Sequence, residues 1–149
     1  MKILVCVDGS AQSMKAVVKA VEIASGCQIN EVTLINVFEK YPFPIFKDDG
    51  GHQIEDKMKE HNLLNEQMVN QNKKYLEHAA MRFREKGIEP DLIMKEGHPA
   101  HTISEVAKGG SFDMIIMGSR GRGNLRSLLL GSVSNAVIQQ TNTSVLVVK

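Results

Sequence analysis

The sequence has no tryptophan, few other aromatic residues and almost no net charge. Only 2 of its 149 residues are tyrosine and 5 are phenylalanine, so it supplies few of the stacking side chains that single-stranded nucleic acids need. The 18 basic and 17 acidic residues leave a formal net charge of +1, whereas a dedicated nucleic-acid binder carries a clear basic excess. We therefore expect no nucleic-acid partner.

Cysteines and long apolar runs are also scarce. The two cysteines, Cys6 and Cys27, do not make a disulfide framework, and Cys6 is interpreted as a small buried hydrophobe because it falls inside an apolar run. That run spans about five residues, which is too short for a signal peptide or a membrane span. We therefore expect a cytoplasmic protein with no membrane partner, and a single domain over residues 1–149.

Strand-like and helix-like segments alternate along the chain. Short apolar, β-branched runs predict strands at 3–7, 31–38, 90–95, 113–117 and 144–148. Helical spacing of apolar residues predicts helices from an N-cap at Ser10 to Gly26, over 53–86, over 99–107 and over 132–140. The third strand is the least apolar and is expected nearer an edge. This order predicts an α/β fold, with one five-stranded parallel sheet and helices on both faces.

Ligands bind such sheets beyond the carboxyl ends of the strands, where the strand order reverses. Two strand exits are rich in glycine and polar residues: Asp8-Gly9-Ser10 and residues 118–123. A Walker-type P-loop is excluded because no Gly-Lys-Ser/Thr occurs. The dinucleotide pattern G-x-G-x-x-G is only begun by Gly121 and Gly123, since Arg126 occupies its third glycine position.

A different glycine spacing follows the fourth predicted strand. Gly118 and Gly121 are separated by nine residues from Gly131 and Ser132. Glycine at 118 and 121 allows positive φ and a close approach of the backbone to a ligand, and successive amides in such turns form an anion-binding nest. Gly131 and Ser132 open a helix whose free N–H groups and dipole favour phosphate, and Ser132 and Ser134 add hydroxyl donors. This pattern predicts a phosphate cradle in two parts.

These residues resemble the universal stress protein family in its nucleotide-binding branch. The family pattern G-x-x-G-(nine residues)-G-[ST] is met by the four positions just described, and the family's D-x-S is met by Asp8-Gly9-Ser10. A further landmark is matched by Gly97-His98-Pro99. The resemblance covers nearly the whole chain and is weakest over 38–53. Asn36 departs from it, because many members carry histidine there.

The resemblance implies a strand order of 3-2-1-4-5 and a site for ATP, with AMP and ADP as alternatives. Adenine is expected near Val7, Asp8 and Val37, and ribose near Asp8 and Gly118; an ionised aspartate suits ribose hydroxyls or an adenine amino group because it only accepts hydrogen bonds. A Mg²⁺ ion would be carried by the phosphates and water, because no carboxylate cluster is evident. The expected nucleotide-binding residues are Val7, Asp8, Gly9, Val37, Met117, Gly118, Ser119, Arg120, Gly121, Gly131, Ser132, Val133 and Ser134.

The function expected from this site is that of an ATP-binding stress-response protein that acts as a nucleotide-dependent switch. We predict no catalytic residue and at most weak ATPase or autophosphorylation activity, because no general base or water-positioning residue is evident. The alternatives are a slow ATP hydrolase or nucleotidyl transferase, and a nucleotide-free dimerisation module. The last predicted strand, Ser144 to Val148, has no proline or internal charge to protect an open edge. We therefore expect it to pair with a second copy in a two-fold homodimer, which the resemblance also implies.

Overall fold

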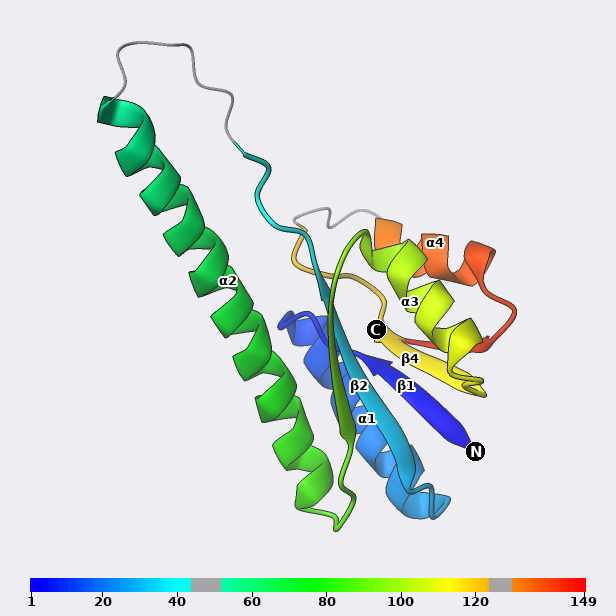
Figure 1. Ribbon diagram of the computed structural model, residues 1–149. Helices are drawn as coiled ribbons and strands as arrows, with labels where there is room; N and C mark the ends of the chain where they lie inside the picture. The colour runs from blue at the N-terminus through cyan, green and yellow to red at the C-terminus, as the bar shows by residue number, and fades with distance from the viewer. Residues whose placement is uncertain (44–51, 124–129) are drawn as a thin grey trace.

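The structure, a computed structural model, describes residues 1–43, 52–123 and 130–149. Its strands form one parallel sheet in the order β3-β2-β1-β4-β5 (Figure 1). This confirms the predicted α/β fold, the strand order and the edge position of the third strand. The elements are β1 (Lys2–Cys6), α1 (Ala11–Gly26), β2 (Glu31–Phe38), α2 (His52–Arg84), β3 (Asp91–Glu96), α3 (Pro99–Gly109), β4 (Met114–Gly118), α4 (Ser132–Gln140) and β5 (Ser144–Val148).

The predicted element boundaries are correct to within two residues. The largest shifts are of two residues: α3 continues to Gly109 rather than ending at residue 107, and α2 stops at Arg84 rather than at residue 86. There the Ile88 N–H donates to the Phe83 carbonyl (3.1 Å) and Gly87 takes a φ of +74°. A glycine in this left-handed region is a common helix stop, since its missing Cβ removes the steric penalty. Gly87 therefore ends the helix as predicted, but residues 85 and 86, which were predicted to be helical, belong to the turn.

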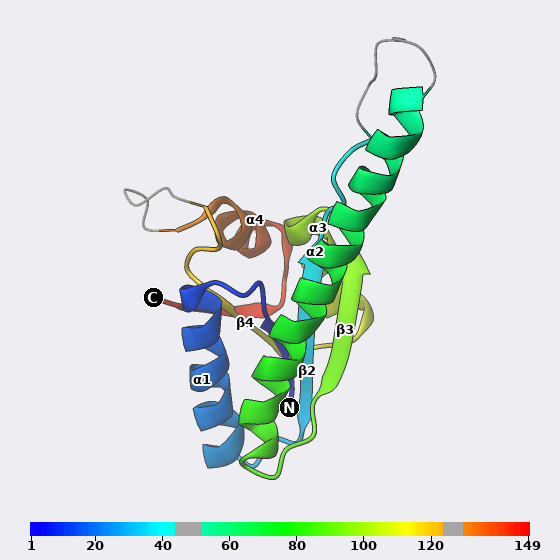
Figure 2. The same cartoon turned by 90° about the vertical axis from the view of Figure 1, so that its left-hand side faces the viewer.

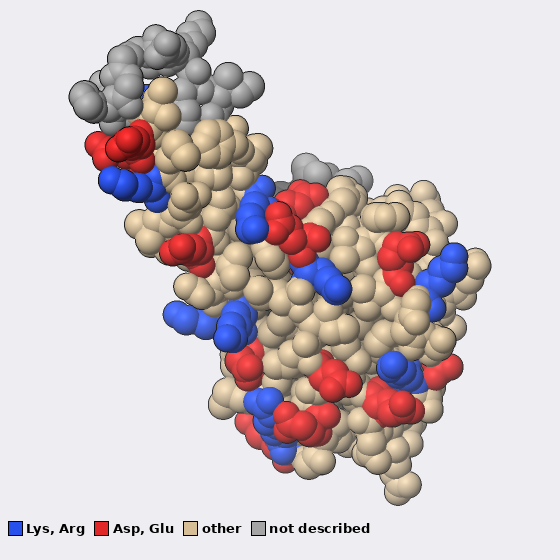
Figure 3. Space-filling view, in the orientation of Figure 1, with Lys and Arg blue, Asp and Glu red and all other residues tan. Residues whose placement is uncertain are grey.

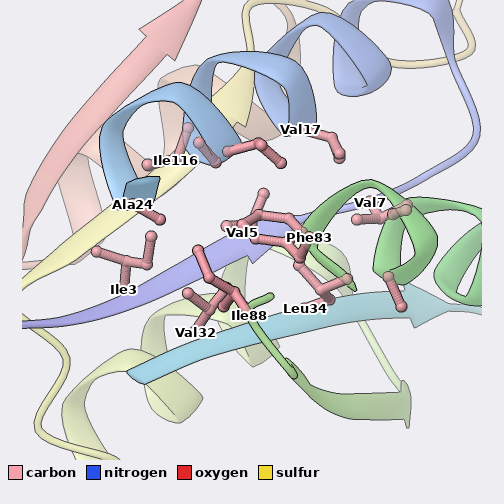
Figure 4. Close-up of a cluster of buried hydrophobic side chains, with 14 of the residues drawn as sticks. Ile3, Val5, Val7, Val17, Ala24, Val32, Leu34, Phe83, Ile88 and Ile116 are labelled. Carbon is pink, nitrogen blue, oxygen red and sulfur yellow. The ribbon is translucent and has the colours of Figure 1, made fainter. Parts of the chain in front are cut away.

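Each face of the sheet has its own hydrophobic core. Under α1 and α2, the side chains of Val5 and Leu34 pack with Phe83, which is fully buried (Figure 4). Under α3 and α4, Leu4 and Ile35 pack in a second cluster. Neighbouring residues of one strand thus serve opposite cores, as expected for a parallel sheet that is covered on both sides.

This topology places three strand ends around one opening. β1 pairs with β2 on one side and with β4 on the other, so the strand order reverses between β1 and β4. The N-terminal part of α2 extends past the sheet at this same end (Figure 2). None of the helices in the described ranges is both long enough and apolar enough to cross a membrane.

Candidate functional site

A cleft of about 820 Å³ lies at the carboxyl ends of β1, β2 and β4. Its volume is near the upper end of the roughly 300–1,000 Å³ typical of small-molecule sites. Further walls come from the start of α4, from Pro99 and Ile103 of α3, and from Met68 and Asn72 of α2. The cleft therefore occupies the place where ligands bind in open α/β sheets.

Eleven of the thirteen predicted nucleotide-binding residues line this cleft. They come from the ends of β1, β2 and β4 and from the start of α4, which the chain brings together from distant parts of the sequence. The eleven are Val7, Asp8, Val37, Met117, Gly118, Arg120, Gly121, Gly131, Ser132, Val133 and Ser134.

The other two predicted residues, Gly9 and Ser119, do not line the cleft but contact elements that form it. Gly9 has a φ of +80°, and a side chain there would run into the Tyr75 ring of α2. Ser119 is fully buried, and its N–H donates to the Val148 carbonyl (2.7 Å). Its carbonyl accepts from the Gly131 N–H (2.7 Å) and the Ser134 hydroxyl (2.9 Å). The Ser119 peptide thus connects the exit of β4 to both β5 and the start of α4.

The turn after β1 holds the Asp8 carboxylate at the mouth of the cleft. The Ser10 hydroxyl accepts from the Ser13 N–H (3.1 Å), which confirms Ser10 as the N-cap of α1. The Ser10 N–H donates to Asp8 Oδ1 (2.9 Å), while a Cβ on Gly121 would lie 2.7 Å from Asp8 Oδ2. The two strand exits recognised in the sequence therefore adjoin, and glycine at 121 leaves room for the carboxylate.

Gly118 is needed for close packing rather than for positive φ, and Gly131 lies in a tight but less restrictive space. Among the described glycines, only Gly9, Gly87 and Gly97 have positive φ, so neither Gly118 nor Gly121 uses the conformational freedom allowed for in the sequence. A Cβ on Gly118 would lie 2.7 Å from the Gln12 carbonyl carbon in the backbone of α1. A Cβ on Gly131 would lie 3.3 Å from the Arg120 Cα. The pattern thus brings the loop after β4 close to α1 and α4.

Among the described residues, none is seen to cap the backbone donors at the start of α4. The first intrahelical hydrogen bond runs from the Asn135 N–H to the Gly131 carbonyl (3.0 Å), so the N–H groups of residues 132–134 have no partner in the preceding turn. The N-cap, Gly131, has no side chain to accept from them, whereas Ser10 caps α1. An uncapped helix start combines free donors with the positive end of the helix dipole, which suits an anion.

The two predicted serine hydroxyls at this helix start differ in their surroundings. Ser132 is exposed and lines the cleft. The Ser134 hydroxyl is buried and lies within hydrogen-bond distance of the Ser119 and Gly131 carbonyls (2.9 and 3.0 Å). Because a hydroxyl has one hydrogen to donate, Ser134 offers the cleft its backbone N–H rather than the hydroxyl that we expected.

Charged groups of both signs border the cleft. Arg120 and Arg122 contribute to its lining, as do Asp8 and Glu39. The Arg122 guanidinium lies 5.2 Å from the centre of the Tyr75 ring, and its Nη2 donates to the Tyr75 hydroxyl (3.1 Å). On the face shown in Figure 3, basic and acidic side chains are interspersed. Arg120 lies beside the start of α4, with its Cα 3.3 Å from the position of a Cβ on Gly131, whereas Arg122 lies against Tyr75 of α2.

The side chains of the cleft give little support for metal or thiol chemistry. The described residues contain no group of three or more His, Cys, Asp or Glu side chains that could hold a metal ion. Burial, with a smaller contribution from the charge of Asp8, raises the pKa of the Cys6 thiol to about 12. A thiol with this pKa is protonated near neutral pH and is a poor nucleophile. This confirms the interpretation of Cys6 as a buried hydrophobe.

Sequence reasoning missed the contribution of α2 to the cleft. Met68 and Asn72 line it from this helix, and Tyr41 does so from the segment after β2. Asn36 also lines it and is 1% exposed, although the sequence marked this residue only as a departure from a family pattern. The sequence does show asparagines at both positions, Asn36 and Asn72. However, it does not show that they line the same cleft, because that depends on where α2 lies on the sheet.

The fold and the cleft define an α/β protein with a cleft at the switch point of a parallel sheet. The model of the universal stress protein family matches residues 1–149, and the chain belongs to that family. The universal stress protein YxiE of Bacillus subtilis is 32% identical over 148 residues, covering 99% of this chain and 98% of YxiE.

Solved structures agree with this assignment. The structure of protein MJ0577 of Methanocaldococcus jannaschii is similar with a TM-score of 0.78 and 28% identity, covering 99% of this chain and 94% of that one. A universal stress protein in complex with cAMP is similar in fold, with a TM-score of 0.63 and 24% identity over 100% of this chain and 97% of that one. The universal stress protein of Archaeoglobus fulgidus in complex with dAMP has a TM-score of 0.60 and 22% identity, over 100% of this chain and 98% of that one.

Proposed function

We propose that the cleft binds an adenine nucleotide, with ATP as the first candidate and AMP and ADP as alternatives. The protein would then act as a nucleotide-dependent switch in a stress response. The observation that carries this proposal is the uncapped start of α4, which lies in one cleft with the Asp8 carboxylate. Donors suited to phosphate and an acceptor suited to ribose hydroxyls thus border the same cavity.

The lining of the cleft would offer each part of such a ligand a suitable surface. Backbone N–H groups of residues 132–134 would donate to the phosphates, with Arg120 beside them and Arg122 elsewhere in the lining of the cleft. The free carboxylate oxygen of Asp8 would accept from the ribose. Buried Val7 and Met117 give the base apolar walls. Similar proteins that bind cAMP and dAMP show that adenine nucleotides are compatible with this fold.

We infer that ATP is held with little or no turnover. Hydrolysis needs a group that orients or deprotonates water and compensates the charge developing on the phosphates. Among the described cleft residues, Asp8 already accepts from the Ser10 N–H, the Cys6 thiol is protonated, and Glu39 lines the cleft from the segment after β2 rather than from the start of α4. A Mg²⁺ ion bound with the nucleotide would be carried by the phosphates and water, because the described lining offers it no carboxylate cluster.

Thermal unfolding in the presence of MgATP tests the proposal. A ligand at one hundred times its dissociation constant stabilises the native state by about 2.7 kcal/mol, which for a chain of this size raises the melting temperature by roughly 5–11 °C. Inorganic triphosphate with Mg²⁺ serves as the control for binding of phosphate alone. A melting temperature that stays constant up to millimolar MgATP would contradict the proposal. Mass spectrometry of small molecules released from freshly purified protein identifies which nucleotide is retained.

We also propose that β5 joins two copies of the chain. β5 lies at the sheet edge beside β4, and its residues from Val145 to Val148 are only partly buried. An apolar edge strand that carries no proline or charge is open to pairing with another strand. Two-fold pairing of β5 with its copy would satisfy both edges at once.

A further inference from the structure

Arg122, in the loop after β4, contacts α2 through Tyr75. Its guanidinium carbon lies 5.2 Å from the centre of the Tyr75 ring, and its Nη2 donates to the Tyr75 hydroxyl (3.1 Å). Among the described residues, no carboxylate forms an ion pair with this arginine. Arg122 is exposed and lines the cleft. A cation of the cleft is therefore bonded to a neutral hydroxyl.

The backbone of Arg122 lies close to α4, although its guanidinium lies against α2. The backbone N of the preceding residue, Gly121, is 3.8 Å from the position of a Cβ on Gly131 at the start of α4. Helix α4 and Tyr75 lie on opposite faces of the sheet, because Val137 of α4 belongs to one hydrophobic cluster and Tyr75 packs against the other. An arginine side chain is long and has many rotamers. The guanidinium can therefore turn away from α2 while the loop backbone stays in place.

The Tyr75 ring is held in place independently of Arg122. It packs against the hydrophobic cluster between the sheet and helices α1 and α2. It also lies directly against the turn after β1, since a Cβ on Gly9 would run into the ring. If the guanidinium turned away, the ring would keep these contacts and only its hydroxyl would change partner. The contact between Arg122 and Tyr75 can therefore break without disturbing the core.

We propose that Arg122 exchanges Tyr75 for a phosphate group when a nucleotide binds. A phosphate group carries negative charge and can accept two parallel hydrogen bonds from one guanidinium, whereas a phenol is neutral and offers one oxygen. Stacking of a cation on an aromatic ring contributes little where the cation is exposed. A phosphate at the start of α4 would therefore draw the guanidinium away from α2. The inference rests on the proposed nucleotide site and adds a conformational response, the release of α2 from the loop after β4.

The effect of Tyr75→Phe on nucleotide affinity tests the exchange. This variant keeps the ring against Gly9 and removes the hydroxyl that competes for Arg122. We expect it to bind MgATP roughly threefold to tenfold more tightly than the parent in isothermal titration calorimetry, because the hydrogen bond to the hydroxyl no longer has to be broken. Unchanged or weaker binding overturns the exchange. Weaker binding would show instead that Tyr75 positions Arg122 for the ligand.

The same substitution in an Arg122→Leu background is the matched control. Without the guanidinium there is no competition for Tyr75 to exert, so Tyr75→Phe should change the dissociation constant for MgATP by less than about twofold. A tightening that persists in this background overturns the exchange. A parent protein that does not bind MgATP refutes the nucleotide site itself and the exchange with it. A parent that binds MgATP but fails the test with Tyr75→Phe refutes the exchange alone.

Nuclear magnetic resonance of the tyrosine rings gives a direct readout of the exchange. The chain has only 2 tyrosines, so isotope labelling of their rings gives two sets of signals, and Tyr41→Phe shows which set belongs to Tyr75. Saturating MgATP should shift the Tyr75 signals, because the guanidinium leaves the ring. Adenosine, which has no phosphate, should leave them in place. Binding of MgATP without a shift, or an equal shift with adenosine, overturns the exchange.

Discussion

Replacing Gly131 by serine would test directly whether the start of α4 holds the phosphates. Gly131 and Ser10 are both N-cap residues, with φ and ψ of −74° and 165° for Gly131 and −74° and 158° for Ser10. In α1, the Ser10 hydroxyl accepts from the N–H three residues later, at 3.1 Å. A serine at 131 has nearly the same backbone conformation, so its hydroxyl can accept from the Ser134 N–H. The protein would then cap the donors that we assign to the nucleotide.

The expected effects on stability and on binding have opposite signs. A serine N-cap is more favourable than glycine by a few tenths of a kcal/mol and more favourable than alanine by about 1 kcal/mol. The new Cβ would lie 3.3 Å from the Arg120 Cα and 3.4 Å from the Ser119 carbonyl oxygen, so these neighbours must shift by a few tenths of an ångström. We expect the free energy of unfolding of Gly131→Ser to stay within about 0.5 kcal/mol of the parent. Loss of a hydrogen bond to a charged phosphate costs about 1.5–3 kcal/mol, which corresponds to a dissociation constant roughly 10–150 times higher.

Calorimetric titration with MgATP and denaturant unfolding without nucleotide measure the two effects. Gly131→Ala is the control, because it adds the same Cβ without a hydroxyl. The serine variant should be more stable than the alanine variant and yet bind ATP more weakly. If serine at 131 binds ATP as tightly as alanine does, the N–H groups of α4 do not hold the phosphates and the argument fails.

Three other properties of the molecule can be tested with simple measurements. Gly118→Ala would place a Cβ 2.7 Å from the Gln12 carbonyl carbon. Because such overpacking against backbone costs about 1–3 kcal/mol, the melting temperature without nucleotide should fall by roughly 2–12 °C. An unchanged melting temperature would show that the contact relaxes freely. A thiol reagent at pH 8 should modify exposed Cys27 quickly and buried Cys6 slowly, because a pKa of about 12 leaves about one Cys6 thiol in ten thousand ionised. Equal modification rates in the two single-cysteine variants would contradict the burial of Cys6. Light scattering at micromolar concentration should give the mass of two chains, and a monomer mass would refute pairing through β5.

The fold was largely predictable because local and global signals agree in this sequence. Ile3 to Val7 is continuously apolar, and Ser10 marks the start of a helix just after it. This combination predicts a buried parallel strand followed by a crossover. The error at the end of α2 came from the helix-terminating turn at Gly87, whose hydrogen bonds change the conformation of the preceding residues without changing the apolar pattern.

The cleft was predictable only where its residues follow one another in the chain. The loop after β4 and the start of α4 could be recognised because their spacing is fixed by the sequence. Asn36 and Asn72 lie on different elements, and both line the cleft only because of how α2 is placed along β2. The role of Gly118 was also hidden, because its packing against Gln12 joins residues that are far apart in the sequence. From the sequence alone, glycine at 118 could equally have indicated a tight turn with positive φ.

The central position of β1 has a consequence for the chain as it is being synthesised. One edge of β1 can pair with β2 early, but the other edge waits for β4, which begins roughly 75 residues after β2 ends. At a synthesis rate of about 5–20 residues per second, that interval lasts roughly 4–15 s. Throughout it, a strand that is apolar from Ile3 to Cys6 has one row of backbone donors and acceptors unpaired and able to bind another chain. The strand at whose end the cleft lies in the finished protein is therefore also a segment of the nascent chain that stays exposed to misassembly for several seconds.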